Sequence, residues 1–188
     1  SAKGNYRYAG QGPGYIDLNA ALTRADARAV WRYLPWVVNA DARQWVRRAL
    51  RSGSSSGANL VLKGDLAHFP FLDRRQGQFL VTVQANDVTL DYGPGWPVIT
   101  GINGDLRFEG AGMIVDAKSG AILGARLSRT RAEIPDFDAP VSMLHIKGNA
   151  EGETAEFLKF IKQSPVAAKI GHFTDRMSAV GKGRLAIG

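Results

Sequence analysis

The fold of this chain is decided by the stretch Phe79-Leu-Val-Thr-Val-Gln-Ala-Asn-Asp-Val-Thr-Leu-Asp-Tyr92, whose nonpolar residues change parity halfway along. In the first half they occupy every second position, the period of a β-strand with one buried face: Phe79, Val81, Val83 and Ala85. In the second half they fall on the opposite parity: Val88, Leu90 and Tyr92. A β-bulge near Asn86-Asp87 would return both sets to one face and bend the strand. The stretch therefore predicts a long, bent strand.

The segments on both sides of this strand predict further strands of the same sheet. Residues 58–66 and 102–109 alternate between nonpolar or small residues and polar ones. Three more strands are expected at 111–118, 121–134 and 141–149, separated by Lys118-Ser119-Gly120 and by the segment 135–140. Short connections and 22 glycines favour tight turns and curvature. The predicted fold is α+β and predominantly β: a strongly curved antiparallel sheet, a β-groove or half-open barrel, with short helices at both ends.

Helices are expected in two places, and the two places resemble each other. The first holds a helical pair near 25–51, a helix over 25–34 and one that Asn39 or Asp41 would cap; the second is a helix over about 153–163. Each follows a similar phrase, at Ile16–Ala21 and Ile146–Glu151, and each precedes a glycine-bounded strand. This pattern predicts an array of repeats. Residues 1–152 would form one curved β-groove repeat, and residues 153–188 a helix plus the first strand of the next.

Composition excludes several classes of function. The 188 residues carry a formal net charge of +7 and no cysteine, which favours anionic partners and excludes disulfides and Cys-ligated metals. The three histidines lack the spacing of metal ligands, and no serine stands in a Gly-x-Ser-x-Gly motif. No pair of carboxylates has the separated environments of an acid and a base. We therefore expect no catalytic residues, no metal and no cofactor, and a protein that is not an enzyme.

The nonpolar face of the predicted sheet is the candidate binding surface. It would be lined by Leu60, Leu62, Leu66, Phe79, Val81, Val83, Val88, Leu90, Leu106 and Phe108. Either the helices cover this face and make an ordinary core, or lipid acyl chains cover it, because a large apolar patch is rarely left in water. Aromatic residues share this face with aliphatic ones instead of alternating with basic ones, so a nucleic-acid partner is not expected.

A basic helix is the second candidate surface. Arg43, Arg47, Arg48 and Arg51 accompany Trp45 within it. This helix would contact an anionic membrane surface or a partner protein, or it would pack Trp45 on the sheet and leave its arginines in water. The sequence leaves both interpretations open.

Several phrases, taken in order, resemble a known family. They are Gly64-Asp-Leu-Ala-His-Phe-Pro-Phe71, Gly77-Gln-Phe79, Leu90-Asp-Tyr-Gly-Pro-Gly-Trp-Pro97, and the ending with Phe157-Leu158, Ser164-Pro165 and Gly181-Lys-Gly183. This ordered set, over residues 30–188, is similar to the YhdP-type proteins of the AsmA-like family.

The resemblance implies a function in lipid transport. Such proteins are large, anchored in the inner membrane of Gram-negative bacteria, and extend through the periplasm as bridge-type lipid carriers built of repeated β-grooves. They move phospholipid toward the outer membrane and support its permeability barrier. The resemblance implies a periplasmic segment that shelters phospholipid or another acyl lipid, with its membrane anchor outside this fragment. Neighbouring repeats of the same chain and envelope proteins would be its partners. The alternative is a structural spacer or partner-docking domain of the envelope, with a closed core and no ligand.

Overall fold

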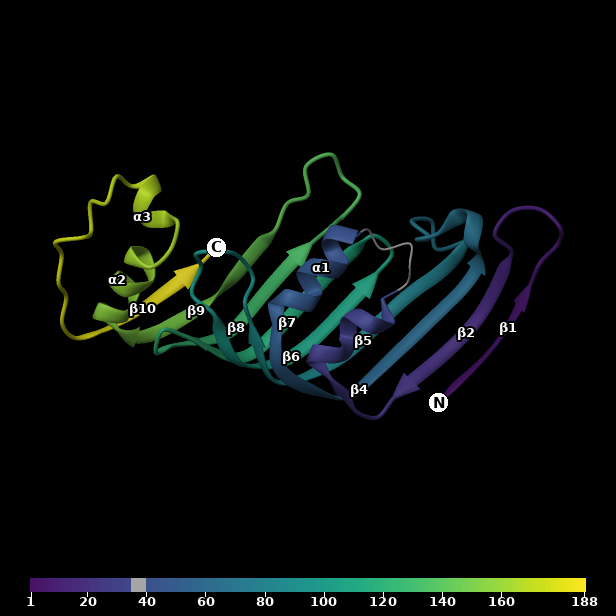
Figure 1. Ribbon diagram of the computed structural model, residues 1–188, viewed down its shortest axis with the longest axis horizontal. Helices are drawn as coiled ribbons and strands as arrows, with labels where there is room; N and C mark the ends of the chain where they lie inside the picture. Colours follow the sequence, from purple (N-terminus) through teal and green to yellow (C-terminus); the bar gives the residue numbers. More distant parts are fainter. Residues whose placement is uncertain (35–39) are drawn as a thin grey trace.

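A single antiparallel sheet of ten strands forms the body of the protein in the computed structural model, which describes residues 1–34 and 40–188 (Figure 1). The strands lie side by side in the order β1-β2-β4-β5-β6-β7-β8-β9-β10, and β3 pairs with β4. Their bounds are β1 Ala2–Arg7, β2 Tyr15–Leu22, β3 Ala25–Asp26, β4 Leu50–Asp65, β5 Gly77–Leu90, β6 Ile99–Glu109, β7 Gly112–Ile122, β8 Ala125–Ile134, β9 His145–Glu153 and β10 Lys182–Ile187. The sheet is open, with β1 and β10 at its two edges.

Short helices accompany the sheet, one group at its β10 edge and the other drawn in front of its middle strands (Figure 1). They are the 3₁₀ helices η1 Ala27–Tyr33 and η2 Leu66–His68, and the α-helices α1 Ala40–Ala49, α2 Thr154–Lys162 and α3 Val166–Lys169. The α+β, predominantly β class and the curved, open antiparallel sheet are thereby confirmed.

One local prediction is wrong in part and another altogether. The expected helix over 25–34 is present as the shorter 3₁₀ helix η1, whereas Ala25 and Asp26 form the strand β3 by pairing with Ser55 and Ser54 of β4. The Asp26 carboxylate then caps η1 by accepting a hydrogen bond from the Arg28 amide. For the second helix, α1 begins at Ala40; the expected cap Asn39 lies outside the described residues.

The second wrong prediction is the break at Lys118-Ser119-Gly120. Strand β7 runs through these residues to Ile122, and the chain reverses at Leu123 and Gly124, both with positive φ. The polar and small residues that suggested a turn instead mark an irregularity inside the strand, where the register with β6 shifts.

The β-bulge predicted in β5 is confirmed, and similar irregularities recur on neighbouring strands. The register between β5 and β6 shifts between Ala85 and Val88, and Asp87 has a φ of 49°. Register shifts at the same level occur between β4 and β5, between β6 and β7, and between β8 and β9. Positive φ values mark the same zone at Gly53, Gly101 and Arg129. Because a bulge bends its strand, a row of bulges creases the whole sheet. We call this row the crease.

Along the crease, hydrogen bonds that involve side chains replace backbone hydrogen bonds between neighbouring strands. The Asn86 side-chain amide donates to the Ser56 hydroxyl at 3.0 Å, and the Asp87 backbone amide donates to the Asn103 side-chain oxygen at 3.0 Å. Asn103 in turn donates to the Ser119 hydroxyl at 3.1 Å. These bonds link β4 to β5, β5 to β6 and β6 to β7 at the positions where bulges leave backbone groups unpaired.

Left-handed backbone geometry at the crease predicts a position-specific effect of alanine. Gly101 has a φ of 62°, in the left-handed region of backbone conformation, whereas Gly57 in β4 lies outside the left-handed region. A Cβ added to Gly57 would meet only the Gln84 side chain, at 3.6 Å. Gly101→Ala is expected to lower the free energy of unfolding by about 1–2 kcal/mol, because a Cβ is strained in the left-handed region. Gly57→Ala should leave it unchanged or slightly higher. Urea unfolding of the two variants measures the difference, and equal effects would contradict a strained crease.

The described residues form no closed hydrophobic core. Among their aliphatic and aromatic side chains, the buried ones belong to Phe71 and to small alanines: Ala27, Ala49, Ala111, Ala125, Ala150 and Ala167. The accessible surface is 12559 Å² for a chain of 20.3 kDa. A compact monomer of this mass exposes about 8,800 Å². The excess follows from a single sheet that lies open on its nonpolar side.

Candidate functional site

The strand registers place the predicted nonpolar residues on one face of the sheet. Residues directly opposite each other in an antiparallel pair project to the same side. One row joins Leu60, Val81 and Phe108 across β4, β5 and β6. The rows beside it pair Leu62 with Phe79, and Val83 with Leu106.

Beyond the crease, the pairing keeps the nonpolar residues together. Val88 lies opposite Ile102, and Leu90 lies opposite Ile99. Leu66 differs from the other predicted residues, because it belongs to η2 after the end of β4 and its amide donates to the Gly14 carbonyl. We call the nonpolar side of the strands the apolar face and the opposite side the outer face. That these residues bind lipid stays a prediction.

The apolar face extends further than the sequence pattern predicted. Registers add residues from β2, β7, β8 and β9 to it: Ile16, Leu18, Ala20, Met113, Val115, Ala132, Ile134 and Ile146. The alternation Ile16, Leu18, Ala20 in the sequence is the signal that would have found the β2 part. With strands spaced about 4.8 Å apart, the face is roughly 30 Å long from β2 to β9.

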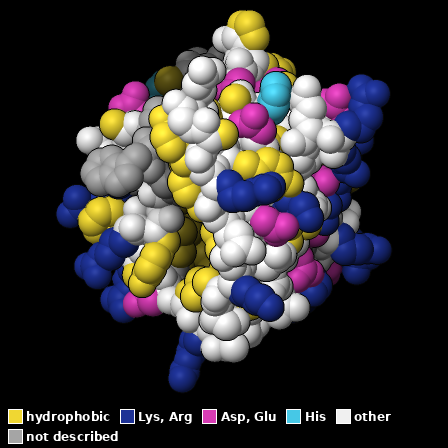
Figure 2. Space-filling view, turned by 90° about the vertical axis from the view of Figure 1, so that its right-hand side faces the viewer, with side chains coloured by type: hydrophobic (Ala, Val, Ile, Leu, Met, Phe, Trp, Pro, Cys, Tyr) yellow, Lys and Arg dark blue, Asp and Glu magenta, His cyan; other side chains and the backbone are white. Residues whose placement is uncertain are grey.

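Much of this face is accessible to solvent. Val81, Val83 and Leu106 are half-buried, and Ile146 is 42% exposed. Viewed from the β1 side, hydrophobic side chains gather around a hollow left of centre, and Lys and Arg side chains lie along the edges and to the right of this hollow (Figure 2). A contiguous nonpolar surface of this extent is typical of a binding site.

At one end of the strands, aromatic side chains fold over the apolar face. The Phe69 ring lies 5.2 Å from the ring of Phe79, and the Phe137 ring stacks on Phe108 at 6.3 Å. Phe69 comes from the β4–β5 connection and Phe137 from the β8–β9 connection. This end of the strands therefore forms a raised rim.

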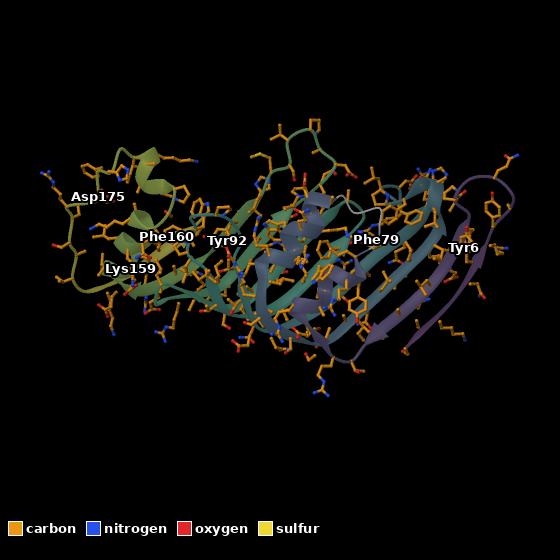
Figure 3. All side chains as sticks on the ribbon, viewed as in Figure 1. Tyr6, Phe79, Tyr92, Lys159, Phe160 and Asp175 are labelled. Atoms are coloured by element: carbon orange, nitrogen blue, oxygen red, sulfur yellow. The ribbon has the colours of Figure 1, made fainter. Side chains whose placement is uncertain are left out.

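The opposite rim is built by the β5–β6 connection and α2. Trp96 lies 5.8 Å from Tyr92 and 5.9 Å from Phe160 of α2, measured between ring centroids (Figure 3). The Trp45 indole of α1 donates to the Tyr92 carbonyl at 3.1 Å. Burial in this cluster raises the pKa of the Tyr92 hydroxyl. The connection thus joins the two helical regions that flank the sheet.

The outer face has the opposite character, because its cross-strand neighbours are charged. Lys63 lies 3.2 Å from Asp17, Lys118 lies 2.9 Å from Asp105, and Arg131 lies 3.0 Å from Asp116. These side chains are about half exposed or more, so each pair contributes little to stability. Their effect is to keep this side hydrated while the other side stays nonpolar.

The arginines of the predicted basic helix do not act as one group. The Arg47 guanidinium lies 4.8 Å from the centroid of the Trp31 ring, and Arg51 belongs to β4, where it pairs with Asp91 at 2.6 Å. Arg43 in α1 is half-buried, and Arg48 in α1 is exposed. A contact of this region with a membrane or a partner stays a prediction.

Metal ligation and membrane spanning have no support in the described part of the chain. Within residues 1–34 and 40–188, no group of three or more His, Cys, Asp or Glu side chains is placed to hold a metal ion. In the same residues, no helix has both the length and the nonpolar character to cross a membrane.

Comparison with known proteins agrees with this arrangement. A family model described as YhdP protein matches residues 1–188. The intermembrane phospholipid transporter YhdP of Escherichia coli (strain K12) is 26% identical over 174 residues, which cover 90% of this chain and 13% of that protein. No solved structure matches the chain. With the family model matching from the first residue to the last, this chain belongs to the YhdP family.

Proposed function

We propose that this chain is a segment of a bridge-type lipid carrier and that its apolar face shelters phospholipid acyl chains. The observation that carries the proposal is the open apolar face itself, whose large side chains are only half-buried although they line up over several strands. A folded domain gains little by leaving such a surface in water. Acyl chains have the shape and polarity to cover it.

The energetics of such a face favour movement along it. Each buried CH2 group contributes about 0.8 kcal/mol, so an acyl chain prefers the apolar face to water by many times the thermal energy. Because neighbouring rows present similar nonpolar side chains, this energy changes little from one row to the next. A lipid would therefore slide across the strands without meeting one tight site.

The cellular context follows from the relative. The chain spans 13% of the length of a protein named an intermembrane phospholipid transporter. We place the chain in the periplasm of a Gram-negative cell, as one part of a longer protein whose membrane anchor lies elsewhere in that protein. Its partners there would be phospholipid and neighbouring repeats of the same chain.

Repeated architecture is supported by the order of elements. Strand β2 is followed by helical segments and then by β4, which pairs with it in antiparallel fashion. Strand β9 is likewise followed by α2, α3 and then its antiparallel partner β10. The predicted repeat boundary at 152/153 falls at the end of β9, and one sheet runs across it. Repeats joined in this way would continue the apolar face from one to the next.

Lipid uptake by the purified chain tests the proposed function. The chain is mixed with vesicles that contain a phospholipid labelled with an environment-sensitive fluorophore on one acyl chain. We expect saturable transfer of the label to the protein, with a blue-shifted emission, and competition by unlabelled phospholipid. Absence of transfer to a folded chain would instead favour the structural spacer of the envelope.

A further inference from the structure

The rim at one end of the strands has a low point between two longer connections. The β4–β5 connection (66–76) and the β8–β9 connection (135–144) both lie at this end, and between them β6 and β7 are joined by Gly110 and Ala111 alone (Figure 1). Gly110 lies near the Pro70 carbonyl of the first connection, and Gly112 lies against the Pro135 carbonyl that starts the second. We call this low point the saddle.

A pocket of about 450 Å³ opens at the saddle, and residues assigned to both faces of the sheet line it. Its lining includes Phe79, Met113 and Ile134 of the apolar face. The same pocket is lined by charged side chains from the outer face and the β4–β5 connection: Arg74, Arg107, Glu109 and Glu133. A lipid lying on the apolar face would therefore meet charged groups where the rim is lowest.

Charges of both signs are interleaved in this pocket. Glu109 accepts hydrogen bonds from Arg107 at 2.7 and 3.0 Å, and it lies 2.8 Å from the Arg74 guanidinium. Glu133 lies two strands from Arg107 in the same cross-strand row, with Ile114 between them, and it pairs with Arg131 at 3.3 Å. Two strand spacings put their backbones about 10 Å apart, so their side chains can reach opposite ends of one small polar group.

We propose that the saddle binds the headgroup of a zwitterionic phospholipid that carries a phosphate and an ammonium group, an inference that rests on the proposed function. Arg74 and Arg107 receive the phosphate, since a guanidinium presents paired donors that match phosphate oxygens. Glu133 and Glu109 receive the ammonium. The acyl chains pass over the saddle onto Phe79, Met113 and Ile134.

Balance of charge selects this headgroup over an anionic one. Two guanidinium groups and two carboxylates line the pocket. Both carboxylates already pair with arginines, Glu109 with Arg74 and Arg107, and Glu133 with Arg131. A zwitterionic headgroup can replace such pairs with its own phosphate and ammonium, whereas an anionic headgroup would take an arginine and leave a carboxylate without a cation. A lipid without a headgroup would gain only from the apolar face.

Binding of three lipids with identical acyl chains tests the proposal. The purified chain is titrated with acyl-labelled phosphatidylethanolamine, phosphatidylglycerol and diacylglycerol. We expect phosphatidylethanolamine to bind about fivefold more tightly than the other two, the range that solvent-exposed ion pairs provide. The double variant Arg74→Gln/Glu133→Gln should lower its affinity to that of diacylglycerol and leave diacylglycerol binding unchanged.

Matched controls separate the saddle from general electrostatics. Arg75 adjoins Arg74 in sequence but pairs with Asp73, and Asp105 pairs with Lys118 on the outer face. Arg75→Gln/Asp105→Asn removes the same two charges and should keep the preference for phosphatidylethanolamine. Equal binding of all three lipids, or a preference for phosphatidylglycerol, would overturn the headgroup site while leaving the apolar face in place. Failure of every lipid to bind would overturn the proposed function itself.

Discussion

A chain carrying Val81→Asp is expected to bind acyl-labelled phospholipid about tenfold or more weakly than the unmodified chain. Val81 lies in the row between Leu60 and Phe108, near the centre of the apolar face. In the free protein this position is half-buried, so we expect the carboxylate to keep part of its hydration and the chain to fold, which circular dichroism checks. A bound acyl chain would cover the carboxylate or avoid it, and losing even two or three CH2 contacts costs about 2 kcal/mol.

The adjacent residue provides the control for this variant. Thr82 lies on the outer face, where Asn59 and Arg107 are its cross-strand neighbours. Thr82→Asp introduces the same charge and the same low β-propensity, but it should leave lipid affinity within about twofold. The lipid titration described for the unmodified chain measures both variants. Equal loss of affinity in the two would contradict binding on the apolar face.

Phe71→Ala is expected to give the largest loss of stability in the described part of the chain, about 3 kcal/mol of the free energy of unfolding. Phe71 is 3% exposed and lies in the β4–β5 connection. Its ring lies so close to Gly64 and Gly77 that a Cβ on either would approach within 2.7 and 2.5 Å of it. Removing the ring leaves a cavity under the connection that forms one side of the saddle.

An exposed phenylalanine serves as the reference for this substitution. Phe173 is 74% exposed, so Phe173→Ala should change the free energy of unfolding by less than about 0.5 kcal/mol. Urea unfolding followed by tryptophan fluorescence compares the two variants. A small effect at Phe71 would show that the glycine-lined contact does not anchor the connection.

Local sequence pattern predicted the sheet well, because parity carries most of the information about which face a strand residue occupies. The change of parity between Ala85 and Val88 identified the bulge in β5, and the structure has it there. The same reasoning failed at Lys118-Ser119-Gly120, where polar and small residues within a strand imitate a turn. Nothing in β7 alone distinguishes a bulge from a turn; the pairing with β6 and β8 decides it.

The open state of the apolar face could not be predicted from pattern. Alternation shows that one face is nonpolar, but it does not show whether helices cover that face. In the structure α2 contacts the apolar face at its β10 edge, where Phe157 lies 3.0 Å from the position that a Cβ on Gly183 would take. The rows around Val81 remain accessible to solvent. The saddle also escaped prediction, because it joins residues from three separate connections.

The crease links local strain to the curvature of the apolar face. Bulged strands twist and bend more than regular ones, and a row of bulges bends them together. Flat sheets do not enclose a groove, and glycines and bulges are the devices that curve them. Weakening the crease through Gly101 is therefore expected to affect the shape of the apolar face as well as stability.

Photo-crosslinking in the full-length protein within a Gram-negative envelope tests lipid binding on the apolar face most directly. A benzophenone amino acid is placed at Leu62, Val81 or Leu106 of the apolar face, and at Asn59 or Thr82 of the outer face as controls. After irradiation, adducts are identified by mass spectrometry. We expect phospholipid adducts at the positions on the apolar face and none at the controls. Absence of lipid from every position on that face, in a folded and functional protein, would contradict a lipid-bearing face.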